Sequence, residues 1–140
     1  DIYIAHSDMI KKWEPSATEG TNVLWVQDAM DISIDANGFL YVVESNNHRV
    51  QKHSIKNLEA GYEGMYSQGV TVAGGNGYGS EANQLYNPQG LFLDAIGNIY
   101  VADSNNHRVQ KYQTTPQIIV KAGNTEGQLT ISGIEDELND

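Results

Sequence analysis

Residues 97–112 read Gly-Asn-Ile-Tyr-Val-Ala-Asp-Ser-Asn-Asn-His-Arg-Val-Gln-Lys-Tyr, and nearly the same run occurs earlier in the chain at residues 38–53. When residues 35–53 are aligned with residues 94–112 at a constant offset of 59, 13 of 19 positions are identical. The identities include an unbroken block, Ser45–Lys52 against Ser104–Lys111. Such self-similarity at one fixed offset shows that the chain contains an internal repeat.

Each copy of the repeat has the pattern of a β-hairpin. Gly97-Asn98, like Asn37-Gly38, is a turn signal between two β-prone runs. Ile99–Ala102 is too short for a helix and uniformly apolar, which predicts a strand covered on both faces. Ser104–His107 predicts a second turn, in which Asn tolerates a left-handed conformation. Arg108–Tyr112 alternates in polarity, as expected of a wetter strand nearer an edge.

These residues resemble the NHL repeat, whose consensus runs roughly Pro-x-Gly, an apolar strand ending in Asp, Gly-x-Ile-Tyr-Val-x-Asp and Asn-His-Arg-Val. The second copy matches from Pro88 through Tyr112, whereas the first has Asp31 in place of Gly, lacks the Pro, and has Glu44 in place of Asp. The resemblance implies an all-β fold, a β-propeller of four-stranded antiparallel blades, and favours an extracellular or periplasmic location.

The repeat divides the chain into about three blades of one partial or open propeller, spanning residues 1–140. Blade one is expected at residues 1–26, where a worn third copy (residues 1–13) predicts strands at 2–6, 9–13 and 22–26. Blade two is expected at 27–73, with strands at 32–35, 39–44, 49–53 and 70–73. Blade three is expected at 90–122, with strands at 90–94, 99–103, 108–112 and 118–122. Residues 123–140 are expected to hold a crossover and a closing strand at 131–136.

Three blades are too few for a ring, because propellers close with about four to eight. We therefore expect either an arc of a longer propeller or a half-propeller that a second copy completes as a six-bladed homodimer. The acidic run Glu135-Asp136-Glu137 favours the arc, since an inner closing strand should be apolar. An arc would leave apolar strands bare at both ends, at residues 91–93 and 2–5 or their equivalents.

Composition narrows the classes of partner. The net charge is −10, from 18 acidic and 8 basic residues, which argues against a nucleic-acid partner. The chain has no cysteine, which excludes disulfides and thiolate metal sites. No apolar run approaches the ~20 residues that cross a bilayer, so membrane insertion is not expected.

The repeated polar residues combine carboxylate, imidazole and guanidinium and so look catalytic. A catalytic group is needed once, whereas a group that holds each hairpin is needed in every blade. We therefore predict a structural role, in which Arg108 donates charge-assisted hydrogen bonds to Asp103 or to blade-edge carbonyls. Neighbouring blades stack ~10 Å apart, so the repeated histidines cannot share one zinc, and no metal or cofactor is expected. The motif comprises Glu44, Asn47, His48, Arg49, Asp103, Asn106, His107 and Arg108.

The function predicted from the sequence is non-catalytic binding of a protein or glycan by loops on one face of a propeller scaffold. The loops that differ between blades are 14–22, 57–68 and 74–87, and the last begins with a glycine-dense inter-blade crossover, Gly74–Ser80. Tyrosines on such loops suit partner contacts. They are Tyr62, Tyr66, Tyr78 and Tyr86. The alternative, on the resemblance alone, is a metal-dependent lyase or hydrolase with a site in the central channel.

Overall fold

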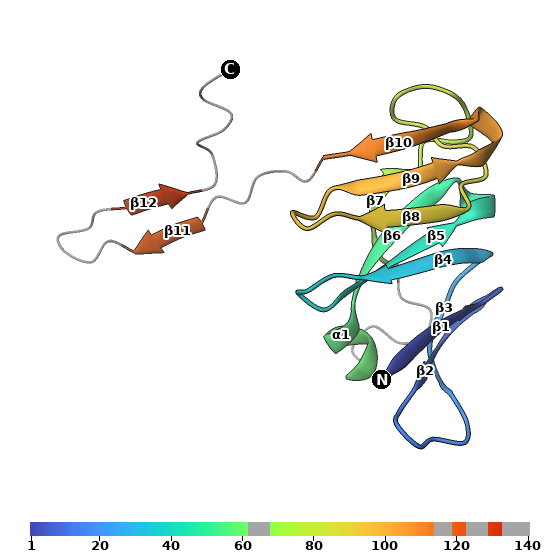
Figure 1. The fold of residues 1–140 in the computed structure, drawn as a ribbon, viewed down its shortest axis with the longest axis vertical. Coiled ribbons are helices and arrows are strands. Elements are labelled where there is room, and N and C mark those ends of the chain that lie inside the picture. Colours follow the sequence, from blue (N-terminus) through green and yellow to red (C-terminus); the bar gives the residue numbers. More distant parts are fainter. Residues whose placement is uncertain (62–67, 114–118, 123–128, 133–140) are drawn as a thin grey trace.

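The computed structural model describes residues 1–61, 68–113, 119–122 and 129–132, with side chains described up to residue 113. In this part of the chain the fold is all-β with one short α-helix, and its strands form antiparallel sheets (Figure 1). Among the described residues, three sheets of three or four strands stack as consecutive propeller blades and do not close into a ring.

Blade one consists of β1 (Ile2–His6), β2 (Met9–Trp13) and β3 (Thr21–Trp25), in the order β1-β2-β3. The sequence prediction of three strands here is confirmed, although this copy of the repeat is worn. Ile10 and Leu24 are fully buried between this sheet and the next one. Val23 (7% exposed) belongs to the same core, and Tyr3 and Ala5 pack against it.

Blade two is the only complete four-stranded sheet among the described residues. It consists of β4 (Ala29–Ile34), β5 (Phe39–Glu44), β6 (Arg49–Ser54) and β7 (Val70–Gly74). Successive side chains of a strand point to opposite faces. Leu40 and Val42 of β5 accordingly pack in the core shared with blade one, while Tyr41 and Val43 pack in the core shared with blade three. This strand is covered on both faces, as the sequence predicts.

Blade three consists of β8 (Gly90–Leu93), β9 (Ile99–Asp103) and β10 (Arg108–Tyr112). Ile99 and Val101 are buried against blade two. On the other face Ala102 is exposed, and so are Phe92 (64%) and Val109 (70%). The expectation that β9 is covered on both faces is therefore wrong within the described structure, because no described blade packs on that side.

The two turns of each repeat are built alike in both copies. Gly38 (φ 82°) and Gly97 (φ 90°) supply the left-handed backbone of the first turn. The second turn is a short 3-10 helix, Ser45–Asn47 or Ser104–Asn106. The residue that ends this helix in the left-handed conformation is a histidine with φ 52°, His48 or His107. The sequence had placed that conformation on Asn, which lies inside the 3-10 helix instead.

The connection after β6 holds a short helix, α1 (Ile55–Glu59), where the sequence analysis expected a loop at residues 57–68. The Ser54 hydroxyl caps it by accepting a hydrogen bond from the Asn57 N–H (3.3 Å). Leu58 is 7% exposed because it packs in the core with blade one. The prediction is therefore wrong for the first part of this connection. Within the described residues, no helix is long and apolar enough to cross a membrane.

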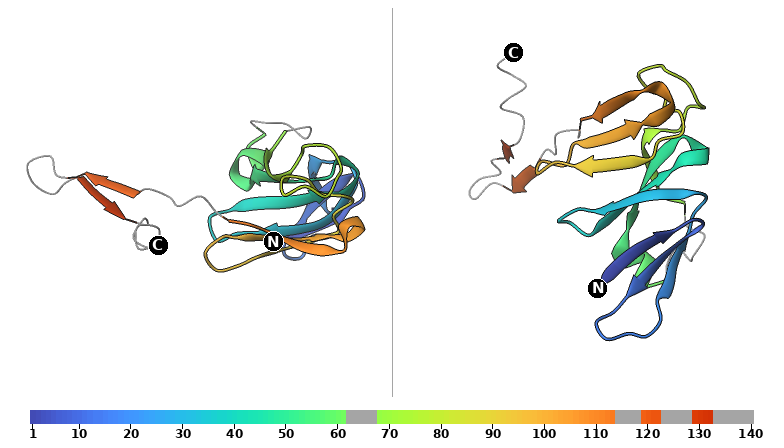
Figure 2. Two further views of the ribbon diagram at one scale, coloured as in Figure 1. Left: turned by 90° about the horizontal axis from the view of Figure 1, so that it is seen from above. Right: turned by 45° about the vertical axis from the view of Figure 1, so that its right-hand side comes forward.

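The C-terminal strands differ from the sequence prediction. β11 (Ile119–Ala122), expected as the outer strand of blade three, pairs with β12 (Leu129–Ser132) and not with β10. Figure 2 shows this two-stranded sheet apart from the blades in both views. Of the closing strand expected at 131–136, residues 133–136 lie outside the described residues. Blade three therefore has three described strands.

Candidate functional site

The register of the strands shows at which of the two ends of the blades each connection lies. Arg49 pairs with both Glu44 and Gly74, and Gly90 pairs with Ala102. The second turns of both repeats thus lie at one end of the sheets, with the short connection 26–28 and the long crossover loop (residues 75–89). We call this the crossover end.

The loops that the sequence analysis grouped on one face do not share an end. Lys12 pairs with Thr21, which places the connection 14–20 at the end opposite the crossover loop. Phe39 pairs with Ser54, which places the start of α1 there as well. Of the loop residues that the structure describes, those of the crossover loop contact the motif of blade three, and Gln68, at the end of the loop 57–68, lies beside the motif of blade two.

In the second repeat, a buried carboxylate gathers the motif. Asp103 is 0% exposed. Its Oδ2 accepts hydrogen bonds from Asn106 Nδ2 and from Arg108 Nε, each at 2.8 Å. Its Oδ1 accepts one from the backbone N–H of Tyr86 in the crossover loop (2.7 Å). All three partners of Asp103 are N–H donors. A buried carboxylate is stable only when such hydrogen bonds compensate its loss of hydration.

Arg108 then holds the crossover loop by its main chain. Its Nη1 donates to the carbonyl of Ser80 (2.8 Å), and its Nη2 donates to those of Glu81 (3.0 Å) and Gln84 (2.9 Å). Asn106 Nδ2 adds a bond to the Gly79 carbonyl (2.7 Å). Arg108 therefore uses both kinds of acceptor that the sequence suggested, the motif carboxylate and backbone carbonyls.

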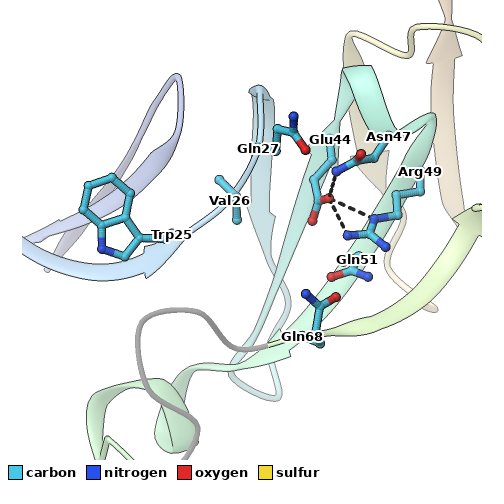
Figure 3. A pocket seen from close by; sticks show the side chains of 8 residues that line it. All are labelled: Trp25, Val26, Gln27, Glu44, Asn47, Arg49, Gln51 and Gln68. Atoms are coloured by element: carbon cyan, nitrogen blue, oxygen red, sulfur yellow. Dashed lines mark hydrogen bonds and ion pairs between the residues drawn. The ribbon is translucent and has the colours of Figure 1, made fainter.

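The first repeat has the same residues with a different surrounding. Glu44, 3% exposed, accepts hydrogen bonds at Oε2 from Asn47 Nδ2 (2.9 Å) and from Arg49 Nε (2.8 Å), and the same oxygen forms an ion pair with Arg49 Nη2 (2.8 Å). The connection that precedes this blade is only three residues long (26–28), so it does not cover the motif as the crossover loop does in blade three. A pocket of about 340 Å³ lies there instead, between that connection and the Glu44–Arg49 pair (Figure 3).

An aromatic cluster lies at the crossover end of blade two. His48 Nδ1 accepts a hydrogen bond from the Asn87 N–H (3.1 Å). Its ring lies 5.5 Å from that of Tyr78 and 5.7 Å from that of Tyr86, and the two tyrosine rings are 5.2 Å apart. Tyr78 is 66% exposed and Tyr86 36%. We call these three side chains the three-ring cluster.

Of the four tyrosines predicted to contact a partner, the structure brings two together and does not describe the other two. Tyr78 and Tyr86 come together as partners of His48, which the sequence analysis had assigned to the hairpin and not to a surface with tyrosines. Only contact across the crossover loop reveals that association, because 30 residues or more separate His48 from both tyrosines. Tyr62 and Tyr66 lie outside the described residues. His107 is exposed. Among the described residues, no three His, Asp or Glu side chains gather in a way that could hold a metal ion.

Comparison with known proteins gives one family. The model of the NHL repeat matches residues 28–52 and 85–112, and no curated protein matches the chain. The matched segments contain the motif strands of blades two and three, whereas the worn copy in blade one is not matched. NHL repeats are generally propeller modules of protein interaction.

Proposed function

We propose that the chain, two segments of which match the NHL repeat, is a non-catalytic binding module that presents the crossover loop, with the three-ring cluster, to a partner protein. The observation that carries the proposal is the exposure of Tyr78 on a loop whose backbone is fixed at many points. Exposed tyrosines are frequent energetic centres of protein interfaces, because they bury much area for few rotatable bonds.

The crossover loop is ordered before any partner arrives. Asn76 Nδ2 donates to the Asn83 carbonyl (2.8 Å), and Gln84 Nε2 donates to the Asn76 carbonyl (3.0 Å). Leu85 is fully buried and anchors the loop in the core between blades two and three. A loop held in this way loses little conformational entropy on binding, which favours affinity.

The shape of the cluster favours a protein over a glycan. Tyr78 projects from a surface loop, whereas small ligands and sugars are generally held in concave sites. A projecting tyrosine suits a pocket on the partner. Because the chain carries a net charge of −10, a neutral or basic partner surface meets least repulsion. The same charge argues against nucleic acid. The alternative of a metal-dependent lyase or hydrolase has no supporting observation in the described residues.

The proposal is tested by affinity capture with matched variants. The Tyr78→Ala/Tyr86→Ala double variant is expected to lose proteins that the parent chain captures. Ile96→Ala is the control, since Ile96 is 78% exposed and lies at the opposite end of the blades. Melting temperatures show whether each variant is folded. Capture that is unchanged in the double variant would refute the proposal, and tyrosine-dependent binding to a glycan array would replace protein by glycan.

We further propose that the blades form one domain whose two outer faces are covered by additional blades in the assembled propeller. Ile2 (65%) and Ile4 (44%) are exposed on blade one, and Phe92 and Val109 are exposed on blade three. Bare apolar side chains on both terminal sheets are what stacking of further blades would bury. Sedimentation equilibrium separates the sources: a concentration-independent dimer indicates that a second copy completes a six-bladed ring, and a monomer that binds a hydrophobic dye excludes it.

A further inference from the structure

We infer that the pocket beside Arg49 is a second binding site, which accepts a main-chain loop of a partner protein in the way that Arg108 holds the crossover loop. The inference extends the proposed binding function to a site that does not involve the three-ring cluster. It comes from comparing two copies of one motif inside the same chain, of which one is filled and the other is open.

The filled copy shows what this donor set binds. Arg108 donates a hydrogen bond from Nε to Asp103, and its two terminal nitrogens donate to three backbone carbonyls of residues 80–84. Asn106 divides its two N–H groups between Asp103 and the Gly79 carbonyl. The ligand of the motif in blade three is therefore a tight piece of main chain that turns its carbonyl oxygens toward the arginine.

The open copy keeps the donors and lacks that ligand. Arg49 donates a hydrogen bond to Glu44 through Nε and forms an ion pair with it through Nη2, and within the described part of the chain its Nη1 forms no hydrogen bond. Asn47 likewise has one described bond, to Glu44. The Arg49 side chain is 25% exposed and lines the pocket (Figure 3). Half-buried N–H groups that have no described protein acceptor favour a ligand that supplies one.

The chain's own upstream connection cannot fill this pocket. The Val26 N–H donates to the Asp8 carbonyl (3.0 Å), and the Ala29 N–H donates to the Ser7 carbonyl. These bonds tie both ends of a three-residue connection to the β1–β2 turn. At about 3.5 Å per residue it has no slack to form a loop like residues 79–84. Within the described part of the chain, this connection therefore leaves the pocket open, and the proposed occupant is a loop of a partner protein.

Charge balance favours a neutral main chain over an anion. Glu44 neutralises Arg49, and the other lining side chains are uncharged, among them Trp25, Gln27 and Gln68. A phosphate or carboxylate would meet the buried charge of Glu44, whereas a carbonyl oxygen would not. Trp25 adds an apolar wall. The volume of about 340 Å³ is at the lower end of the range for ligand pockets, about 300–1,000 Å³, which suits a single turn of chain.

The test uses the crossover loop itself as the probe. A cyclic peptide with the sequence of residues 76–86, Asn-Gly-Tyr-Gly-Ser-Glu-Ala-Asn-Gln-Leu-Tyr, presents the turn that the filled copy holds. The chain has two arginines, Arg49 and Arg108, so their side-chain Nε–H signals report the open and filled copies separately in an NMR titration. We expect a saturable shift of the Arg49 signal with no shift of the Arg108 signal. A scrambled cyclic peptide is the control.

Two variants and one control variant keep the test decisive. Arg49→Lys retains the charge but loses the planar fork, and is expected to weaken peptide binding about tenfold or more. Gln27→Trp fills the mouth of the pocket from an exposed position without touching the Glu44–Arg49 pair, and should abolish binding. Ala36→Trp, exposed at the other end of blade two, should leave binding unchanged.

Several outcomes would overturn the inference. They are no shift at Arg49, a shift at Arg108 alone, undiminished binding to Gln27→Trp, and an equal Arg49 response to sodium acetate, which would indicate an anion site. The Tyr78→Ala/Tyr86→Ala variant should bind the peptide normally. Failure of the three-ring proposal and failure of this one are therefore distinguishable.

Discussion

Residues 45–52 and 104–111 are identical in sequence, and yet the side chains of the two copies have different partners. In blade three the arginine faces a long crossover loop and is engaged with its carbonyls, whereas in blade two the arginine faces a short connection and an open pocket. For the histidines, the copy in blade two is the one that contacts the crossover loop: His48 accepts a hydrogen bond from Asn87, whereas His107 is exposed. The motif thus supplies fixed donors, and the length of the neighbouring connection decides whether they are used.

The largest difference between the copies should appear when the carboxylate is removed. Asp103→Ala leaves Arg108 without its counter-charge under a covering loop and should lower the free energy of unfolding by about 3–5 kcal/mol. Glu44→Ala should cost less, about 1–3 kcal/mol, because water in the pocket can reach Arg49. Chemical denaturation of both variants measures the difference. Equal losses would contradict the view that only one copy is filled.

Removing the arginines should give a smaller difference in the same direction. Arg108→Ala loses three carbonyl bonds as well as the bond to Asp103, and should lower the melting temperature by several degrees, for a loss of about 1.5–3 kcal/mol. Arg49→Ala loses contacts with Glu44 only and should melt closer to the parent chain. If Arg108→Ala melted like the parent while a partner was lost, Arg108 would be a binding residue and not a structural one.

Replacing each histidine by glycine should change the stability of the protein in opposite directions. His107 has φ 52° and an exposed side chain, so His107→Gly should be neutral or should stabilise by up to about 1 kcal/mol, because glycine adopts this backbone without strain. His48→Gly gains the same relief but loses the bond from Asn87 and two ring contacts, so it should destabilise. Thermal melts of the two variants provide the measurement, and destabilisation by both would contradict the assignment.

The smallest expected effect concerns acid. Partial desolvation acts to raise the pKa of Asp94, but hydrogen bonds from the Asn98 side chain, from two backbone N–H groups and from Tyr100 outweigh it and lower the pKa. A lowered folded-state pKa contributes stability above the unfolded value of about 3.8, and that stability is lost as the pH falls through the folded value. Asp94→Asn should therefore reduce the loss of melting temperature between about pH 5 and pH 3. An unchanged acid profile would refute this.

Local pattern was enough for much of the fold. The glycine turns and the apolar run before Asp103 predict the hairpins, because a hairpin of this kind depends on residues close in sequence. The worn copy at residues 1–13 predicts the first two strands of blade one in the same way. The prediction was wrong for Leu58, in an expected linker, because its burial depends on a helix docking against a neighbouring blade. Ala102 was misjudged for the same reason, since cover on its face depends on a further blade.

The sequence by itself determined the repeat, the hairpins, the acidic charge and the grouping of Asp103, Asn106 and Arg108 as one motif, because these follow from spacing and composition. Only the tertiary structure decided which copy is filled, that His48 joins Tyr78 and Tyr86, and that Arg49 borders a pocket. Those facts depend on where a loop from one blade meets the turn of another. Sequence identity fixes the donors that a motif carries, while the acceptors they find are set by chain segments many residues away.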